Sequence, residues 1–230
     1  MEPIVETKGV KRLYGTGPTA VHALQGVELR VQAGRLVVLK GRSGSGKTTL
    51  LNLLGALDRP TAGEVFFQGK EIGSLSEKER TWLRRNRMGF VFQSFGLFPL
   101  MSAAENVEFS LRLSGVSSRE WAKRVEQALE RVGLGKRAQH RPFEMSGGEQ
   151  QRCAIARAIV HRPALLLADE PTAELDSRMG LAISRLFRSL VEEDGMSIVM
   201  TTHDPSVMEV ADDVYELEDG CIRSWQQANS

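Results

Sequence analysis

Cysteine is nearly missing from this chain, which has only Cys153 and Cys221 among its 230 residues. Two thiols so far apart in the sequence supply neither a disulfide framework nor the paired cysteines of a zinc site. Small disulfide-stapled folds and zinc modules are therefore excluded. We interpret both cysteines as structural thiols.

Long apolar runs are missing too. Stretches such as residues 50–54 and 164–168 are far shorter than the roughly 20 apolar residues that cross a bilayer. The sequence begins Met1-Glu2-Pro3, without the basic cluster and apolar stretch of a signal peptide. We expect a chain that does not span a membrane and stays in the cytosol.

The chain also lacks an excess of charge of one sign, because 30 Lys and Arg nearly balance 29 Asp and Glu. This balance gives no reason to expect a nucleic-acid partner. No internal repeat or low-complexity tract stands out, which argues against a solenoid. The length suits one substantial core, as a single domain or as a domain with a smaller lobe.

What the sequence does contain is an alternation of short apolar runs with helical stretches. Such alternation predicts an α/β core with a mostly parallel sheet. Asp219-Gly220, between the last two expected strands, is a typical hairpin turn. The expected strands are residues 21–31, 35–39, 64–68, 88–92, 164–168, 196–201, 214–217 and 221–225, and the expected helices are residues 47–57, 76–87, 150–160 and 177–192.

The middle of the chain, from residue 105 to about 134, is expected to form a helical lobe. Ser117 and Glu120 have the spacing of a capping box, which predicts a helix start at Ser117. The apolar positions fit the buried face of a helix. These positions, at spacings of four, four and three, are Trp121, Val125, Leu129 and Val132.

Residues 41–48 read Gly-Arg-Ser-Gly-Ser-Gly-Lys-Thr, which fits the P-loop pattern between an expected strand and an expected helix. Glycines let backbone amides curl around phosphate oxygens at a helix N-terminus. Lys47 is expected to reach the β- and γ-phosphates, and the Thr48 hydroxyl to bind Mg²⁺. The alternative is a Gly/Ser loop that binds nothing, which the position after a strand disfavours.

Two adjacent carboxylates, Asp169 and Glu170, end a second apolar strand. Neighbouring side chains of a strand point to opposite sides, so the two can have different roles. We expect Asp169 to hold Mg²⁺ and Glu170 to act as the general base on the attacking water. The alternative is a pair of acids that only caps the next helix.

A further motif, residues 145–152, reads Met-Ser-Gly-Gly-Glu-Gln-Gln-Arg and resembles the signature sequence of the ABC ATPase family. Residues 173–176, Ala-Glu-Leu-Asp, are placed like its D-loop, and Thr202-His203-Asp204 like its switch histidine. Gln93 is placed like its Q-loop glutamine. The resemblance extends from about residue 14 to 220.

This resemblance implies a P-loop NTPase core, an N-terminal antiparallel β subdomain and a helical signature subdomain. Residues 1–230 then form a single ABC ATPase domain, with the helical lobe at about residues 94–160. The resemblance also implies a homodimer, or a pair of cassettes, around two ATP molecules. In such a dimer the signature of one subunit binds the γ-phosphate of the nucleotide held by the other.

The resemblance assigns roles to individual residues. Tyr14 is expected to stack on adenine and His203 to contact the γ-phosphate, while Gln93 is expected to bind Mg²⁺ and sense the attacking water. Glu170, His203, Gln93 and Lys47 are the implied catalytic residues, and Thr48, Gln93 and Asp169 the implied metal ligands. The implied ATP contacts are Tyr14, Gly41, Ser43, Gly44, Ser45, Gly46, Lys47, Thr48, Thr49, Ser146, Gly147, Gly148 and Asp176.

An apolar cluster follows Gln93 in an expected loop. In the family this region lines a groove that accepts a coupling helix from a membrane permease. Ordinary packing between the lobe and the core is an equal alternative. The cluster consists of Phe95, Leu97, Phe98, Leu100 and Met101.

Within the family, residues 54–63, 105–107 and 140–142 look most like the bacterial lipoprotein-release and macrolide-efflux branch. That resemblance implies an ATPase at the cytoplasmic face of the membrane that drives a separate permease for export or extraction. A non-transporting cell-division regulator and a soluble DNA-repair ATPase are the alternatives. Ala173-Glu174 replaces the Gly-Asn often found in this branch, and Arg42 stands at a variable P-loop position.

Overall fold

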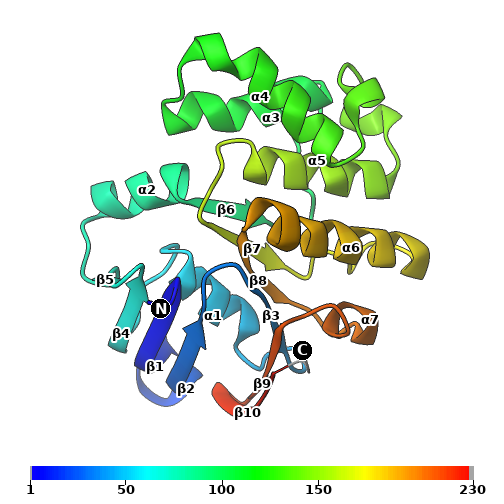
Figure 1. The fold of residues 1–230 in the computed structure, drawn as a ribbon. Helices are drawn as coiled ribbons and strands as arrows, with labels where there is room; N and C mark the ends of the chain where they lie inside the picture. Colours follow the sequence, from blue (N-terminus) through cyan, green and yellow to red (C-terminus); the bar gives the residue numbers. More distant parts are fainter. Residues whose placement is uncertain (1, 228–230) are drawn as a thin grey trace.

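The structure is a computed structural model that describes residues 2–227. Its larger sheet has the strand order β10-β9-β3-β8-β7-β6 (Figure 1). All neighbouring strands are parallel except the terminal hairpin β9-β10. The bounds are β3 (Leu36–Lys40), β6 (Met88–Val91), β7 (Leu165–Asp169), β8 (Ser197–Thr201), β9 (Asp213–Glu218) and β10 (Cys221–Gln227).

The smaller sheet is antiparallel and has the order β2-β1-β4-β5. Its strands are β1 (Val5–Tyr14), β2 (Val21–Val31), β4 (Ala62–Phe67) and β5 (Lys70–Glu71). The sequence pattern did not indicate β1 or β5. In β1 the register with β2 shifts between Thr7 and Val10, and Gly9 there has φ 57°. Such a bulge breaks the alternation that marks a strand.

Seven helices are described: α1 (Lys47–Leu54), α2 (Glu77–Asn86), α3 (Ala103–Ser114), α4 (Ser118–Arg131), α5 (Gly147–Ile159), α6 (Ser177–Asp194) and α7 (Pro205–Met208). Helices α3, α4 and α5 form the lobe at the top of Figure 1, and α1 lies between the two sheets. The predicted fold class is confirmed: a P-loop core, an antiparallel β subdomain and a helical subdomain.

The predicted capping box at Ser117 is wrong. Helix α4 does follow Ser117, but the Ser117 side chain accepts no capping hydrogen bond. The Glu120 carboxylate instead accepts two hydrogen bonds from Arg124, one turn further along the helix. Capping boxes are present at Ser102 with Glu105 and at Ser146 with Glu149. The second of these starts α5 at Gly147, three residues before the predicted start.

Apolar side chains cover both faces of the larger sheet. Along β3, Leu36 and Val38 belong to a cluster shared with the lobe and α6, whereas Val37 and Leu39 belong to a cluster shared with α1 and the smaller sheet. Strands buried on both faces read as continuous apolar runs, which explains why they were visible in the sequence. Each fully buried Leu or Val contributes about 1.5–3 kcal/mol to the stability of the core.

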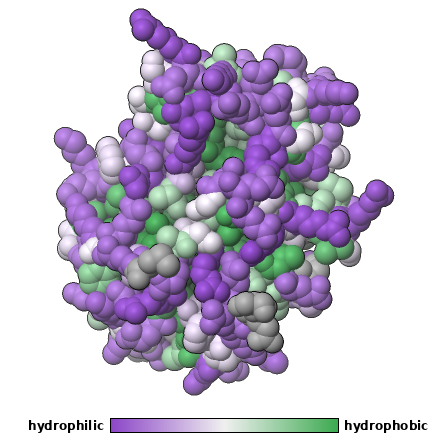
Figure 2. Space-filling model, viewed as in Figure 1, coloured by the Kyte–Doolittle hydropathy of each residue, from purple (hydrophilic) through white to green (hydrophobic). Residues whose placement is uncertain are grey.

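Between residues 2 and 227, no helix combines the length and apolar character that a membrane span requires. On the face shown in Figure 2, hydrophilic residues cover most of the surface and hydrophobic ones form separate patches.

Candidate nucleotide-binding site

The P-loop joins the C-terminal end of β3 to the start of α1. Gly46 is the N-cap of α1 and has φ 102°. A Cβ atom there would lie 2.5 Å from the Ala23 carbonyl oxygen, so only glycine fits. The loop is therefore held close to β2 and leaves the first amides of α1 facing the cavity, as an anion site requires.

Lys47 is 6% exposed, yet its charge is satisfied. Its Nζ atom donates hydrogen bonds to the carbonyl oxygens of Gly41, at 2.8 Å, and Arg42, at 3.1 Å. It also lies 3.8 Å from Glu170 Oε1. The ammonium group is thus fixed across the mouth of the P-loop, where it can meet a phosphate.

Asp169 is fixed by two threonine hydroxyls. Thr48 Oγ1 donates to Asp169 Oδ1 at 3.1 Å, and Thr201 Oγ1 donates to the same oxygen at 2.6 Å. Thr201 is the last residue of β8 and is in register with Asp169. Sequence reasoning missed Thr201, although its place at the end of a strand beside the acidic strand was a usable signal.

Glu170 has a positive φ of 44°, a backbone conformation that costs a non-glycine residue about 1–3 kcal/mol. Its amide donates to Thr201 Oγ1 at 2.9 Å, which holds this conformation. The carboxylate lies between two basic groups, with Oε1 near Lys47 and Oε2 3.5 Å from His203 Nδ1. Glu170 therefore faces the same space as Lys47 and is a candidate proton acceptor.

These residues border one cavity of about 520 Å³. Its size suits a small-molecule ligand. Predicted site residues from four separate segments meet there, together with residues 21–23 of β2. The predicted lining residues are Gly41, Ser43, Gly44, Gly46, Lys47, Thr48, Thr49, Gln93, Asp169, Glu170 and His203.

Ser45 and Tyr14 do not line this cavity. Ser45 is buried behind the loop, and its Oγ atom has no hydrogen-bond partner among the described residues. Tyr14 is 38% exposed and donates to Asp58 Oδ2 at 2.8 Å, and the Arg12 guanidinium lies 4.3 Å from its ring centroid. Tyr14 pairs with Val21, a lining residue, and so lies next to the cavity.

The signature residues Ser146, Gly147 and Gly148 are also absent from the cavity lining. They start α5, where Ser146 Oγ accepts from the Glu149 amide at 3.3 Å. A Cβ atom on Gly147 would lie 3.7 Å from Leu175 Cδ2, so the D-loop packs beside the signature. Asp176 caps α6 by accepting a hydrogen bond from the Met179 amide at 2.9 Å. Signature and D-loop thus form a second surface, separate from the cavity.

The apolar cluster after Gln93 is divided by the fold. Phe98 lines a groove of about 330 Å³ with Phe92 and Phe109, and its ring makes an edge contact with Phe109 at 4.8 Å between centroids. Leu97 packs against the core and Leu100 is 80% exposed. The groove therefore retains only Phe98 of the predicted docking residues.

Asn106 gives this loop its shape, a role that sequence reasoning missed. It is fully buried, and its Oδ1 atom accepts from the Phe98 amide at 2.8 Å. Its Nδ2 atom donates to the carbonyl oxygens of Phe98, Met101 and Ser102. One amide side chain on α3 therefore holds both ends of the 98–102 segment.

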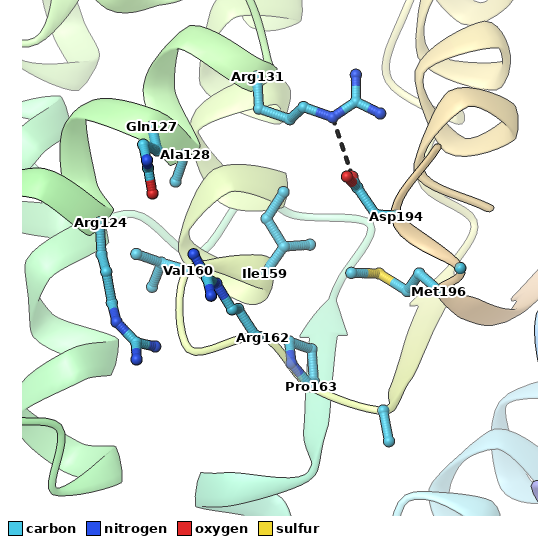
Figure 3. Close-up of a pocket in the computed structure, with 12 residues that line it drawn as sticks. Arg124, Gln127, Ala128, Arg131, Ile159, Val160, Arg162, Pro163, Asp194 and Met196 are labelled. Atoms are coloured by element: carbon cyan, nitrogen blue, oxygen red, sulfur yellow. Dashed lines mark hydrogen bonds and ion pairs between the residues drawn. The ribbon is translucent and has the colours of Figure 1, made fainter. Parts of the chain in front are cut away.

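Another cavity, of about 480 Å³, lies between the lobe and the core. It is bordered by α4 and by the residues just before β7 and β8, and the Arg131 Nε atom bridges to Asp194 Oδ2 at 3.0 Å across it (Figure 3). Asp169 and Thr201 stand at the opposite ends of the same two strands. This cavity is therefore not part of the P-loop site.

Comparison with known proteins agrees with this geometry. The model of the family described as "ABC transporter" matches residues 24–173. The macrolide export ATP-binding/permease protein MacB of Syntrophobacter fumaroxidans is 45% identical over 95% of this chain, and the match spans 31% of the relative. An ABC transporter ATP-binding protein of Methanocaldococcus jannaschii is 42% identical over 95% of this chain and 97% of its own.

Among solved structures, the ATP-binding cassette MJ0796 in a dimeric post-hydrolysis state with ADP and Pi has a TM-score of 0.90 and 40% identity. The match covers 98% of this chain and 99% of that one. The predicted resemblance to the macrolide-efflux branch is confirmed by the MacB relatives. The chain therefore belongs to the ABC transporter family and has the fold of its ATP-binding cassettes.

Proposed function

We propose that this chain binds and hydrolyses ATP as the motor subunit of an ABC transporter at the cytoplasmic face of a membrane. The observation that supports this most strongly is the convergence of Lys47, Asp169 and Glu170 on the P-loop cavity. In the proposed reaction the oxygen of a water attacks the γ-phosphorus, and the bond to the β–γ bridging oxygen breaks. Glu170 accepts the proton of that water, and ADP leaves with the bonding electrons.

Two features of the site favour this chemistry. The Lys47 ammonium and the amides at the start of α1 offer positive charge where the triphosphate is expected, which stabilises charge that develops in the transition state. The Glu170 backbone is held by its bond to Thr201, so the carboxylate needs little rearrangement to reach a water. His203 is 72% exposed beside Glu170, where it can contact the γ-phosphate.

The oxygen atoms of Thr48 and Asp169 fit Mg²⁺, which prefers hard oxygen ligands. No group of three or more His, Cys, Asp or Glu residues suited to a metal is found in residues 2–227. We therefore expect phosphate oxygens and water to complete the ligand set, together with Gln93, which lines the same cavity. The ion would neutralise part of the phosphate charge.

We also propose that two copies close around two ATP molecules. The support is that the signature surface cannot serve its own cavity, because residues 146–148 do not line it. The start of α5 offers amides and a dipole that favour an anion. A second copy would place this anion site on the exposed side of the bound phosphates. The MJ0796 cassette, 40% identical, is described as dimeric.

The partner is proposed to be a membrane permease that docks in the groove of Phe92, Phe98 and Phe109. Phe92 is 44% and Phe98 39% exposed beside the groove, so two large apolar side chains are available there for a partner. The MacB and pyoverdine export PvdT relatives are named as joint ATP-binding/permease proteins. Export is the direction that those relatives suggest.

The experiment that tests this function is steady-state ATP hydrolysis with Mg²⁺, for wild type and Glu170→Gln. Wild type is expected to release phosphate and the variant to bind ATP with little turnover. ATP binding without turnover by wild type, even with the permease present, would contradict the proposal.

A further inference from the structure

Two charged side chains near the phosphate site, those of Arg42 and Glu174, are exposed and make no ion pair with any other residue between 2 and 227. Arg42 is exposed in the P-loop and Glu174 is exposed in the D-loop. Neither side chain makes an ion pair of 4.0 Å or less with any residue that the structure describes. Each side chain is long and flexible, so both can reach a partner in a second copy of the chain.

We propose that Arg42 of each copy pairs with Glu174 of the other copy when the dimer closes on ATP. This inference rests on the proposed dimer and adds the residues that decide its affinity. A two-fold symmetric dimer contains the pair twice, since each copy contributes one Arg42 and one Glu174.

The packing of the D-loop brings these residues together. Leu175 lies against Gly147 of the signature, so Glu174 is fixed one residue from the signature surface. In the closed dimer that surface meets the phosphates held by the partner's P-loop. Arg42 stands beside Gly41 at the edge of that loop and borders the same cavity. A dimer that places Gly147 of one copy on the phosphates of the second copy therefore also brings Glu174 toward the second copy's Arg42.

Charge supplies a second reason. A carboxylate that approaches two bound triphosphates is repelled unless a cation stands between them. Glu174 has the acidic residues Glu170 and Asp176 close by in sequence, and Arg178, four residues further on, makes no ion pair of 4.0 Å or less with it among the residues that the structure describes. Lys47 is already held by the Gly41 and Arg42 carbonyl oxygens. Arg42 is the P-loop cation that remains for Glu174.

The test uses charge reversal and mixing in a Glu170→Gln background, which is expected to bind ATP and hydrolyse it slowly. Arg42→Glu alone creates two like-charge contacts per dimer, as does Glu174→Arg alone. Each is expected to weaken ATP-dependent dimerisation by about tenfold or more, in the range of close interfacial charge pairs. An equal mixture of the two variants restores two opposite-charge contacts in the heterodimer. The mixture is expected to dimerise within about threefold of the background.

The mixture distinguishes loss of the Arg42–Glu174 pair from other effects of the two substitutions. A loss caused by weaker ATP binding to the Arg42→Glu chain persists in the mixture, since that chain still carries the defect. Equilibrium binding of a fluorescent ATP analogue measures that defect directly. Because opposite charges at a partly exposed site are screened by salt, the difference between single variants and mixture should shrink as salt rises.

The dimer is measured by light scattering with ATP and Mg²⁺, using one tagged chain to detect heterodimers. If the background chain itself forms no dimer, the proposed dimer function fails. The Arg42–Glu174 pair is wrong, and the dimer stands, if the background dimerises and each single reversal dimerises equally well. The same holds if the mixture dimerises no more tightly than the single variants. If a reversal prevents folding, a double-mutant cycle with the milder Arg42→Ala and Glu174→Gln variants takes its place. The pair is wrong if the two losses of dimerisation free energy are additive.

Discussion

Replacing Thr201 by Val removes one hydroxyl from the centre of the site and keeps the shape of the side chain. That hydroxyl donates to Asp169 Oδ1 at 2.6 Å and accepts from the Glu170 amide at 2.9 Å. Thr201 is fully buried, so water does not replace it. A hydrogen bond to a charged group contributes about 1.5–3 kcal/mol, and the free energy of unfolding is expected to fall by that amount.

The effect on turnover follows from what Thr201 holds. Asp169 keeps its contact with Thr48, and the Glu170 amide keeps the Thr201 carbonyl oxygen at 3.2 Å. Both carboxylates are then less fixed. Loss of a group that orients a metal ligand typically costs 10- to 100-fold in metal affinity or activity. We expect kcat to fall within about that range, with a higher Mg²⁺ concentration needed for half-maximal rate.

The assay is ATP hydrolysis over a Mg²⁺ series, combined with urea unfolding. Thr7→Val is the matched control, because Thr7 is also buried and its hydroxyl bonds to the Val27 carbonyl oxygen in the smaller sheet. The control should lose about 1 kcal/mol of stability and keep its Mg²⁺ dependence. A Thr201→Val protein with wild-type kcat and Mg²⁺ dependence would refute the reasoning.

Three further predictions concern other parts of the molecule. Phe98→Asp places a charge in the proposed docking groove and should abolish co-purification with the permease while ATP binding is retained; unchanged co-purification would refute the docking site. Asn106→Leu leaves buried backbone groups of the 98–102 segment without hydrogen-bond partners. The free energy of unfolding, measured by urea denaturation, should fall by about 3 kcal/mol or more. A loss below about 1 kcal/mol would contradict this prediction. Burial raises the pKa of the Cys153 thiol to about 11, and the thiolate is the form that reacts. A disulfide reagent at pH 8 should therefore label Cys221 and spare Cys153, which peptide mass spectrometry can determine.

Those parts of the site whose functional residues are neighbours in the sequence could be predicted from local motifs. The P-loop could be recognised because the glycines, Lys47 and Thr48 lie within eight positions, directly after an apolar strand. The acidic pair could be recognised because both faces of β7 are buried, so the residues before Asp169 form an uninterrupted apolar run. Fold class followed from the same alternation.

Other features depend on partners that sequence spacing does not reveal. Thr201 is important only because β8 lies beside β7 in register. Asn106 acts through a loop whose path was unknown. The Ser117 box failed because the Glu120 amide donates to the Ser117 carbonyl oxygen and the Glu120 carboxylate accepts from Arg124. Strand β1 was missed because a bulge at Gly9 breaks its alternation.

The roles of Tyr14, the signature residues and Asp176 remain predictions for a similar reason. In a single copy Tyr14 bonds to Asp58 and Asp176 caps a helix. Their expected contacts need a nucleotide or a second copy of the chain.

The central claim is an ATP-driven dimer that opens on hydrolysis. The most direct test measures ATP turnover and oligomeric state on the same samples of wild type and Glu170→Gln, with ATP and Mg²⁺. The account predicts turnover by wild type, and an inactive variant that is trapped as an ATP-dependent dimer. A wild-type chain that neither binds ATP nor dimerises, even with its membrane partner supplied, would contradict it.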